Sequence, residues 1–379
     1  MAVTTAATTT PSGAKPVSAW LFVVAALIAV MVIVGGATRL TDSGLAIVEW
    51  RPVTGAIPPL TEADWRAEFE KYKAIPEYQL VNRGMSLAAF KQIYWWEWGH
   101  RFLGRFVGAA FLLPFLYFLL RRMIKRRLAW KLAGLFVLGG LQGALGWWMV
   151  ASGLSERIDV SQYRLAAHLA LAVLLFAATL WIALDLRFPS PACGRGDRGE
   201  GATTKSASVD TPSPPVPLPQ AGEGRGALRV TAIALVFAVY LQMILGAFVA
   251  GLRAGRLYNT WPLMDGRFFP EGYFSGPPGF NDLFETAAAA QFNHRIGAYL
   301  VAAAAVAFFF AARKTAAAGN ARILLLAVFA QIALGIWTVI TATPLPLGLL
   351  HQAGALAVLA AAVVAAHRIR YYNTTSISP

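Results

Sequence analysis

The chain has 379 residues, of which 57% are hydrophobic and only 14% are charged. That balance leaves too little polar surface for a water-soluble globule of this length, so it indicates a membrane protein. The formal net charge of +14 does not require a nucleic-acid partner, because the basic residues concentrate in alternate connections between apolar segments.

Apolar runs of about 20 residues, the length that an α-helix needs to cross the hydrocarbon core, recur along the chain. We expect eight of them, and hence an all-α integral membrane protein with eight transmembrane helices. The second run is the least uniform, because Arg101 and Arg105 lie in its first turns. The runs lie near 17–37, 100–120, 129–151, 164–186, 229–251, 294–312, 321–342 and 348–370.

The connections differ in their content of basic residues. The segments 121–131 and 187–229 each hold six Lys or Arg, and 313–322 holds three. By the positive-inside rule, these connections and both termini face the cytoplasm. The side so defined carries 18 basic and 5 acidic residues, which accounts for nearly all of the net charge.

Composition also divides the chain into parts. The segment 187–228 is rich in Gly, Pro, Ser and charge and cannot bury a core, which predicts a disordered cytoplasmic linker. It separates an N-terminal four-helix half, 17–186, from a C-terminal four-helix half, 229–370. The tails 1–16 and 371–379 are expected in the cytoplasm.

The two halves resemble each other in sequence. "LQGALGWWMVASGL" at 141–154 recurs as "LQMILGAFVAGLRAG" at 241–255 and "AQIALGIWTVITATPLPLG" at 330–348, each with a Gly four residues after a Gln. "EWGHRFLGR" at 97–105 is echoed by "QFNHRIGAY" at 291–299. An even number of helices per half predicts a parallel repeat. The alternative is that small residues merely allow close helix packing.

Two long connections are expected on the outer side. The segment 38–99 is dense in aromatic and charged residues, and "TEADWRAEF" within it begins with a Thr cap followed by acids. These features predict short amphipathic helices over the mouth of the bundle. The corresponding segment 252–293 is rich in Gly and Pro and is expected to be irregular.

Four of the five histidines occupy equivalent places in the predicted helices. His100 and His294 are expected to begin the second and sixth helices, and His168 and His351 to lie one turn into the fourth and eighth. Because even-numbered helices start on the outer side, these four should share one depth near the outer leaflet. His367 lies at the opposite end beside basic residues, which indicates an interfacial side chain.

A single intramembrane histidine could simply bond a neighbouring helix, but four at one depth form a more specific pattern. The only cysteine, Cys193, lies in the predicted linker, and no cluster of acids accompanies the histidines, which argues against zinc and di-iron sites. Imidazoles on facing helices suit the axial ligation of heme iron. The expected pairs are His100 with His168 and His294 with His351.

The surroundings of the two pairs differ. Glu97 lies three residues before His100, on the same helix face, whereas Gln291 holds that place before His294. A carboxylate beside a heme can transfer protons and an amide cannot. The first pair therefore looks reactive and the second like a permanent cofactor site. The alternative for Glu97 is a weak surface ion pair with Arg101.

Basic side chains accompany both pairs. They could bind heme propionates directed toward the outer surface, and the alternative is snorkelling to the interface. Arg105, a turn deeper, is the one least easily explained by snorkelling. The candidates are Arg101, Arg105, Arg164 and Arg295.

Several motifs carry a resemblance to a known family. "GGATRLTDSGLAIVEWRPVTGAIPPL", "PEYQLVNRGM", "YWWEWGHRFLGR" and "AQFNHRIGAY" resemble the heme A synthase family, in the branch found in alphaproteobacteria and mitochondria. The resemblance covers roughly 17–370 apart from 187–226. Another branch carries a cysteine pair in its first outer loop, and this chain has none there.

The resemblance implies a heme-dependent oxidoreductase of the bacterial inner membrane. It would oxidise the C8 methyl group of heme O to a formyl group through a hydroxymethyl intermediate, giving heme A for cytochrome c oxidase. His294 and His351 would ligate a resident heme b, His100 and His168 would hold the substrate heme, and Glu97 would be the catalytic acid. Either one iron ligand leaves to admit oxygen, or electron removal is followed by attack of water; the sequence favours neither.

Two other functions fit the histidines. A non-catalytic diheme b-type cytochrome would need hemes near both membrane surfaces, whereas these four histidines are expected near one. A heme carrier would not require an acid beside only one pair. Because no flavin or dinucleotide motif is present in the sequence, an external electron donor is expected. A heme O synthase partner and a homo-oligomer are further possibilities.

Overall fold

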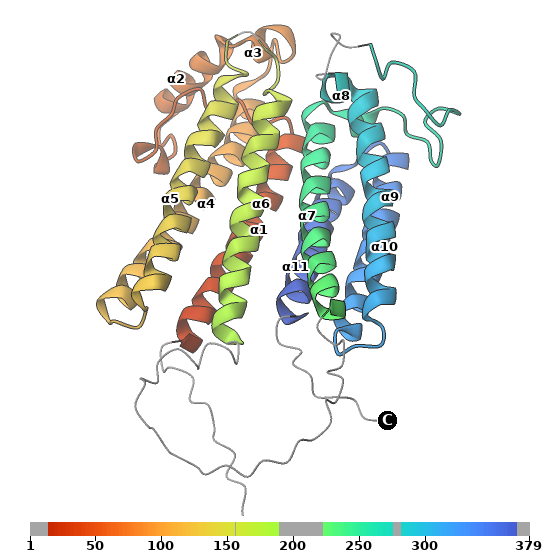
Figure 1. The fold of residues 1–379 in the computed structure, drawn as a ribbon. Coiled ribbons are helices and arrows are strands. Elements are labelled where there is room, and N and C mark those ends of the chain that lie inside the picture. The colour runs from red at the N-terminus through yellow and green to blue at the C-terminus, as the bar shows by residue number, and fades with distance from the viewer. Residues whose placement is uncertain (1–13, 156, 189–222, 276–281, 370–379) are drawn as a thin grey trace, which may run out of the picture.

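A computed structural model describes residues 14–155, 157–188, 223–275 and 282–369 of the chain (Figure 1). Within these ranges the secondary structure is helical, and eight helices are long and apolar enough to cross a membrane, which confirms the predicted fold class. They are α1 (Ala14–Leu40), α4 (Leu87–Leu120), α5 (Arg126–Ala151), α6 (Gln162–Arg187), α7 (Glu223–Gly251), α9 (Ala287–Ala312), α10 (Ala318–Ile340) and α11 (Leu345–Ile369).

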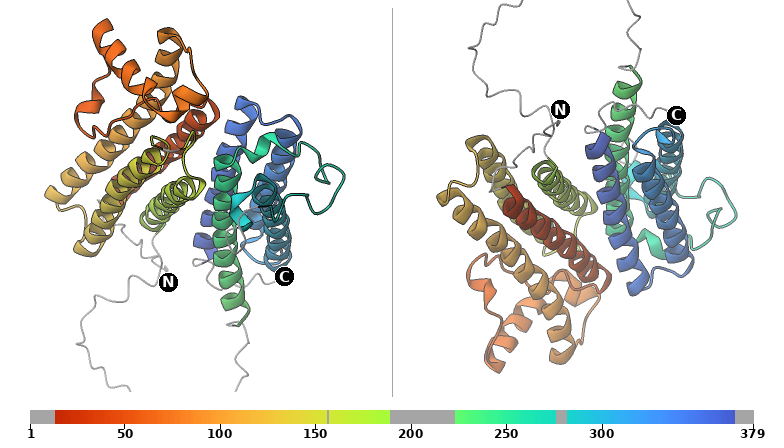
Figure 2. Two further views of the ribbon diagram at one scale, coloured as in Figure 1. Left: turned by 90° about the horizontal axis from the view of Figure 1, so that it is seen from above. Right: turned by 90° about the horizontal axis from the view of Figure 1, so that it is seen from below.

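The eight long helices pack as two groups of four. In the first group α1 contacts α4 and α6, and α5 also contacts both of these; in the second, α7 contacts α9 and α11, and α10 also contacts both. Seen along the helix axes in Figure 2, the groups stand side by side, joined where α6 meets α7 and α11. We call them the N-terminal and C-terminal halves. Their origin as a duplicated repeat stays a prediction.

Two helices begin earlier than the hydropathy pattern predicts. We expected the second transmembrane helix to start near 100, but α4 starts at Leu87, so His100 lies well inside it. The sixth starts at Ala287, before His294. A side-chain cap fixes each start: Ser86 accepts from the N–H of Ala89 at 3.2 Å, and Thr286 accepts from that of Ala289 at 3.0 Å. Such caps satisfy otherwise unpaired backbone donors.

The long outer connection folds onto this extension of α4. It contains α2 (Glu62–Lys73) and α3 (Pro76–Leu80), which confirms the predicted short helices. Thr61 caps the start of α2 as expected, and Asp64 completes a capping box with it, with bonds of 3.1 and 3.0 Å. Aromatic rings of α2 pack against α4, with the centroids of Phe69 and Phe90 4.9 Å apart. Because α2 covers the first turns of α4, a sequence rich in aromatic and charged residues can form helix ahead of the apolar run.

The predicted linker falls mainly on residues 189–222, which lie outside the described residues. Its last residues, from Glu223, belong to α7. In the second outer connection the described part contains the short helices Ala254–Arg256 and α8 (Asp282–Glu285) and an isolated bridge between Met264 and Arg267. The connection is thus largely irregular, as expected from its Gly and Pro content.

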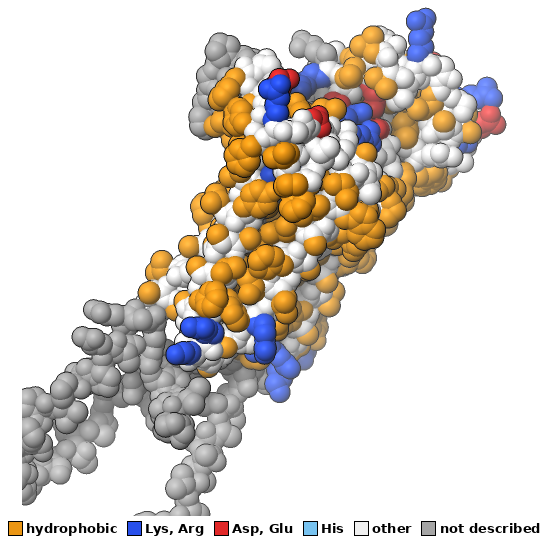
Figure 3. Space-filling view, turned by 90° about the vertical axis from the view of Figure 1, so that its right-hand side faces the viewer, with side chains coloured by type: hydrophobic (Ala, Val, Ile, Leu, Met, Phe, Trp, Pro, Cys, Tyr) orange, Lys and Arg blue, Asp and Glu red, His pale blue; other side chains and the backbone are white. Residues whose placement is uncertain are grey.

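Charge is distributed unequally between the two ends of the bundle. On the face seen in Figure 3, hydrophobic side chains cover the middle. Lys and Arg stand without acidic neighbours at the lower end, whereas both signs occur at the upper end. The two ends of the bundle on this face therefore differ in charge, and the middle is apolar.

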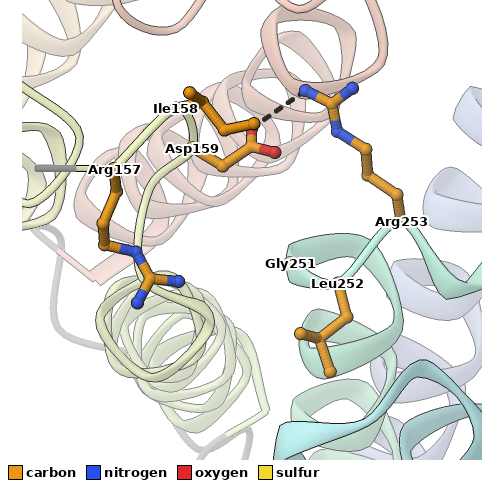
Figure 4. Close-up of a pocket in the computed structure, with 6 residues that line it drawn as sticks. All are labelled: Arg157, Ile158, Asp159, Gly251, Leu252 and Arg253. Atoms are coloured by element: carbon orange, nitrogen blue, oxygen red, sulfur yellow. Dashed lines mark hydrogen bonds and ion pairs between the residues drawn. The ribbon is translucent and has the colours of Figure 1, made fainter. Parts of the chain in front are cut away.

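Ion pairs join the two halves at the upper end. The guanidinium groups of Arg39 and Arg253 each donate to the same carboxylate oxygen of Asp159 at 2.9 Å. Arg39 also donates to the carbonyl of Gly251 at 3.1 Å. Figure 4 shows the ion pair of Asp159 and Arg253, two of the residues that line a cavity of ≈ 420 Å³. Because Asp159 comes from the first half and Arg253 from the second, these bonds fix the halves at this end.

A buried acid lies beside this junction. Glu77 of α3 is only 4% exposed, and one of its carboxylate oxygens has no hydrogen-bond partner among the described residues. Burial, assisted by the negative charge of Asp159, raises the pKa of Glu77 to about 7. The folded protein therefore retains a proton on this side chain that an unfolded chain releases near its ordinary pKa of 4.5.

Replacing this acid is expected to stabilise the protein in alkaline solution. Because the pKa of Glu77 in the folded state, about 7, exceeds 4.5, its contribution to stability is lost as pH rises through this window. Glu77→Gln should therefore raise the free energy of unfolding at pH 8 by up to about 3 kcal/mol and change it little below pH 4.5. Thermal unfolding of the detergent-solubilised proteins at both pH values tests this, and identical pH dependence of the two proteins would contradict it.

Candidate functional site

Each of the four candidate histidines lies against a glycine of a neighbouring helix. A Cβ atom built on each of these glycines would lie 2.8–3.2 Å from Cε1 of the imidazole, too close for an alanine without movement of the ring. The glycine therefore creates the space that the ring fills between the helices. The contacts are Gly35 of α1 with His100 of α4, Gly146 of α5 with His168 of α6, Gly246 of α7 with His294 of α9, and Gly335 of α10 with His351 of α11.

The structure brings His294 and His351 together. Their ring centroids are 6.4 Å apart and their planes differ by 79°. Since metal–imidazole nitrogen bonds are about 2 Å long, a metal held between two rings places their centroids roughly 6 Å apart. The separation observed therefore fits axial ligation of one iron by both rings. His100 of α4 and His168 of α6 each pack against a glycine of a neighbouring helix, as the members of the other pair do.

Glutamines contact three of the four histidines. The amide nitrogen of Gln242 lies 3.0 Å from Nδ1 of His294 and donates to the carbonyl oxygen of that residue at 2.8 Å. Gln331 makes the same contacts with His351, and Gln142 with His168. The amide nitrogen of Gln142 also lies 3.4 Å from Nε2 of His168. The sequence repeat marks these glutamines, but their contact with the histidines was not predicted.

Glu97 is buried in the structure and fully engaged by neighbours. Only 3% of the residue is exposed. One carboxylate oxygen accepts from the N–H of Ile47 at 2.8 Å, and the other accepts from Arg101 at 2.6 Å. The ion pair considered from the sequence is therefore present, but it lies inside the protein and not on the helix surface.

Gln291 holds the equivalent position in the other half, but it donates hydrogen bonds to the outer connection, whereas Glu97 accepts one from it. It is also 3% exposed. Its amide donates to the carbonyls of Ala254 and Leu257 at 2.9 and 2.7 Å, and its oxygen accepts from Arg295 at 3.1 Å. Each side chain thus ties its outer connection to a helix, and Glu97 is the only one of the two that can transfer a proton.

The four candidate arginines are held mainly by backbone carbonyls. Arg101 donates to the carbonyl oxygen of Ile47 and to the carboxylate of Glu97. Its guanidinium lies 5.8 Å from the ring centroid of Trp147. Arg105 is distinct because its Nη1 is buried without a hydrogen-bond partner among the described residues. The other carbonyl acceptors are those of Arg51 and Pro52 for Arg105, Trp148 for Arg164, and Tyr258 and Leu263 for Arg295.

The expectation for His367 was wrong. Its side chain is fully buried, and its Nε2 lies 2.9 Å from the carboxylate of Asp185 on α6. Its ring also meets that of Trp181 edge to face at 5.3 Å. An acid from a distant helix satisfies the imidazole inside the bundle, so His367 is part of the contact between the two halves.

Comparison with known proteins identifies the family. The family model described as "Cytochrome oxidase assembly protein", COX15-CtaA, matches residues 18–363. The chain belongs to this family. It is 50% identical over 350 residues to a protein of Parvibaculum lavamentivorans named heme A synthase, covering 92% of this chain and 93% of that protein.

Further relatives carry the same name. A heme A synthase of Caulobacter vibrioides is 48% identical over 94% of this chain and 96% of its own length. One from Rhodopseudomonas palustris is 50% identical over 95% of this chain and 92% of its own length. The similarity therefore includes both halves and every candidate residue lies within the matched family region.

Filling one of the glycine contacts should disrupt the site. Gly335→Ala places a methyl group 2.8 Å from Cε1 of His351 and forces the ring to move. We expect the content of the heme predicted at this pair to fall, with an affinity loss of about tenfold or more. Gly319→Ala on the same helix meets nothing within 4 Å and serves as the control. Heme absorbance per purified chain measures both variants, and equal absorbance would contradict the assignment.

Proposed function

We propose that this protein is a heme A synthase, which oxidises the C8 methyl group of heme O to a formyl group through a hydroxymethyl intermediate. The product, heme A, would supply cytochrome c oxidase. The observation that carries the proposal is the identity of about half the residues, over nearly the whole length, to proteins named heme A synthase. The histidines of the two halves, each packed against a glycine of a neighbouring helix, support it.

In this proposal the C-terminal pair holds a permanent heme b. His294 and His351 would hold its iron, since their 6.4 Å centroid separation leaves room for one metal ion between the rings. When bound, the heme supplies one-electron transfer. The chain's own contribution is to exclude water and fix the rings, through the glycines behind them and the glutamines at Nδ1.

The N-terminal pair receives the substrate. His100 and His168 lie on α4 and α6, the helices equivalent to those that carry the other pair. Oxidation of a methyl to a formyl group removes hydrogen from one carbon, so a proton acceptor is needed beside it. Glu97, three residues before His100, is that group in our proposal. Arg101 and the N–H of Ile47 hold its carboxylate in one orientation.

Arginines at the outer mouth would bind the propionates of the hemes. Arg105 is the strongest candidate beside the substrate pair, because its Nη1 has no partner among the described residues while its other nitrogens are fixed by carbonyls. A charged hydrogen bond from this atom to a propionate would satisfy it. Arg164 and Arg295 are the corresponding candidates beside His168 and His294, and Arg101 is already paired with Glu97.

The proposed orientation follows from the distribution of charge. Both termini and the basic connections lie in the cytoplasm, and the histidine pairs lie toward the outer side of the bacterial inner membrane. The formyl oxygen comes either from dioxygen, with an external donor that supplies the electrons to reduce the second oxygen atom to water, or from water, with an external acceptor for the electrons removed from the methyl carbon. A diheme electron carrier or a heme carrier is the alternative function, and the near full-length similarity to heme A synthases favours the enzyme.

Product analysis tests the proposed reaction. The protein is expressed with a heme O synthase in a host that lacks heme A, and the extracted hemes are separated by chromatography. We expect heme A and a hydroxylated intermediate. Accumulation of heme O alone, in cells that contain the folded protein, would exclude the enzyme function.

In the same assay Glu97→Gln is expected to abolish heme A formation. The amide resembles that of Gln291 at the equivalent position and can remain buried, but it cannot accept a proton. Heme absorbance at the other pair should stay close to that of the unaltered protein. Glu70→Gln changes an acid whose side chain is 67% exposed and is the matched control. Near-normal heme A from Glu97→Gln would refute the role of Glu97.

A further inference from the structure

Three of the four histidines contact a glutamine through Nδ1, and within the described residues His100 does not. Gln142, Gln242 and Gln331 each place an amide nitrogen 3.0–3.1 Å from Nδ1 of their histidine. Nδ1 of His100, in contrast, is buried and has no hydrogen-bond partner among the described residues. The difference therefore concerns one atom of one imidazole at the substrate pair.

Methionine occupies the place of the missing glutamine. Met31 lies four residues before Gly35, as each glutamine lies four residues before the glycine behind its histidine. Its methyl carbon lies 3.2 Å from the Cβ position of Gly104 on α4. In the other half the oxygen of Gln242 lies against Gly297, which is three residues after His294, whereas Gly104 is four residues after His100. Met31 thus packs against the helical turn that follows His100, as Gln242 packs against the turn that follows His294, but it has no amide.

An amide at Nδ1 matters once the other ring nitrogen binds iron. A neutral imidazole ligated through Nε2 carries its proton on Nδ1, and an acceptor for that proton orients the ring and increases its basicity. The side-chain oxygens of all three glutamines are buried without partners among the described residues. Rotation of the amide by half a turn would place this oxygen beside Nδ1–H. The hydrogen bond that the amide nitrogen now donates to the histidine carbonyl would then be lost. A thioether is only a weak acceptor.

We propose that the three glutamines are positioning residues that keep their histidines on iron, and that Met31 leaves His100 as the ligand that detaches. The resident heme is then held by two supported rings and stays. The substrate heme is held by one supported ring and one unsupported ring, so that it can enter and leave. This inference rests on the proposed function, because it assumes that both pairs bind heme.

Installing the missing amide tests the inference directly. The purified protein is loaded with hemin, and transfer of hemin to apomyoglobin is followed by absorbance. The fast phase is assigned to the substrate pair by its loss in His168→Ala. Met31→Gln, a change of similar size, should slow this phase about tenfold. Val30→Gln adds an amide to the same helix at a residue that is 47% exposed and is the control. A fast phase unchanged in Met31→Gln would overturn the proposal.

The reverse change gives a readout that does not depend on catalysis. Gln242→Met copies the arrangement at His100 onto the resident pair. Loss of an acceptor at Nδ1–H lowers ligand basicity, so the midpoint potential of the resident heme should rise and its transfer to apomyoglobin should accelerate. An unchanged potential and transfer rate would refute the positioning role. Should Met31→Gln fail to fold, Gln142→Met supplies the test at the substrate pair, with faster loss expected and unchanged loss contradicting it.

Heme content of two histidine variants distinguishes failure of the proposed heme sites from failure of the inference about the glutamines and Met31. If His168→Ala and His351→Ala both leave the hemin content unchanged, the proposed heme sites are wrong. If these variants lose hemin but the methionine and glutamine exchanges have no effect, the heme sites stand and the inference alone is wrong.

Discussion

An imidazole packs against a glycine of the neighbouring helix at four places, and this contact sets how closely the helices that carry the site can approach each other. It occurs between α1 and α4, α5 and α6, α7 and α9, and α10 and α11, so each half carries two such contacts. Each contact lets two helices approach closely while a polar ring lies between them. The rings of His294 and His351 consequently reach a separation that suits one iron.

Similar helices in the two halves hold side chains of different chemistry. Glu97 and Gln291 are equally buried, each beside an arginine one turn further on, and each fastens an outer connection. The acid accepts where the amide donates, so the geometry is retained while only one half gains a group that can exchange protons. Met31, in the position held elsewhere by glutamine, makes a second difference at the same pair. Both differences lie in the half that we assign to the substrate.

Much of the fold could be predicted from the sequence because a membrane restricts it. Eight apolar runs require eight helices, and "TEADWRAEF" carries its own cap. The start of α4 was not predictable from hydropathy, because rings of α2 and not lipid surround its first turns. The burial of His367 depends on Asp185 of another helix, a contact that no local pattern records.

The candidate site was predictable in its residues and less so in their contacts. The recurrence of the histidines in both halves and the family motifs single out the four imidazoles and Glu97. The glutamine contacts could have been suspected, because each Gln precedes a Gly by one helical turn in three of the repeats. Recognising Met31 as the exception required the structure, since only the contact of Gly35 with His100 shows that the spacing from Met31 to Gly35 matches that of the glutamines.

In the proposed function one histidine pair holds a resident heme and the other histidine pair holds the substrate heme. The most direct test is the heme composition of two variants purified from cells that make heme b and heme O. His351→Ala should lose heme b and retain heme O, whereas His168→Ala should retain heme b and lose heme O and its oxidised products. Loss of the same heme from both variants would contradict the division between the two pairs.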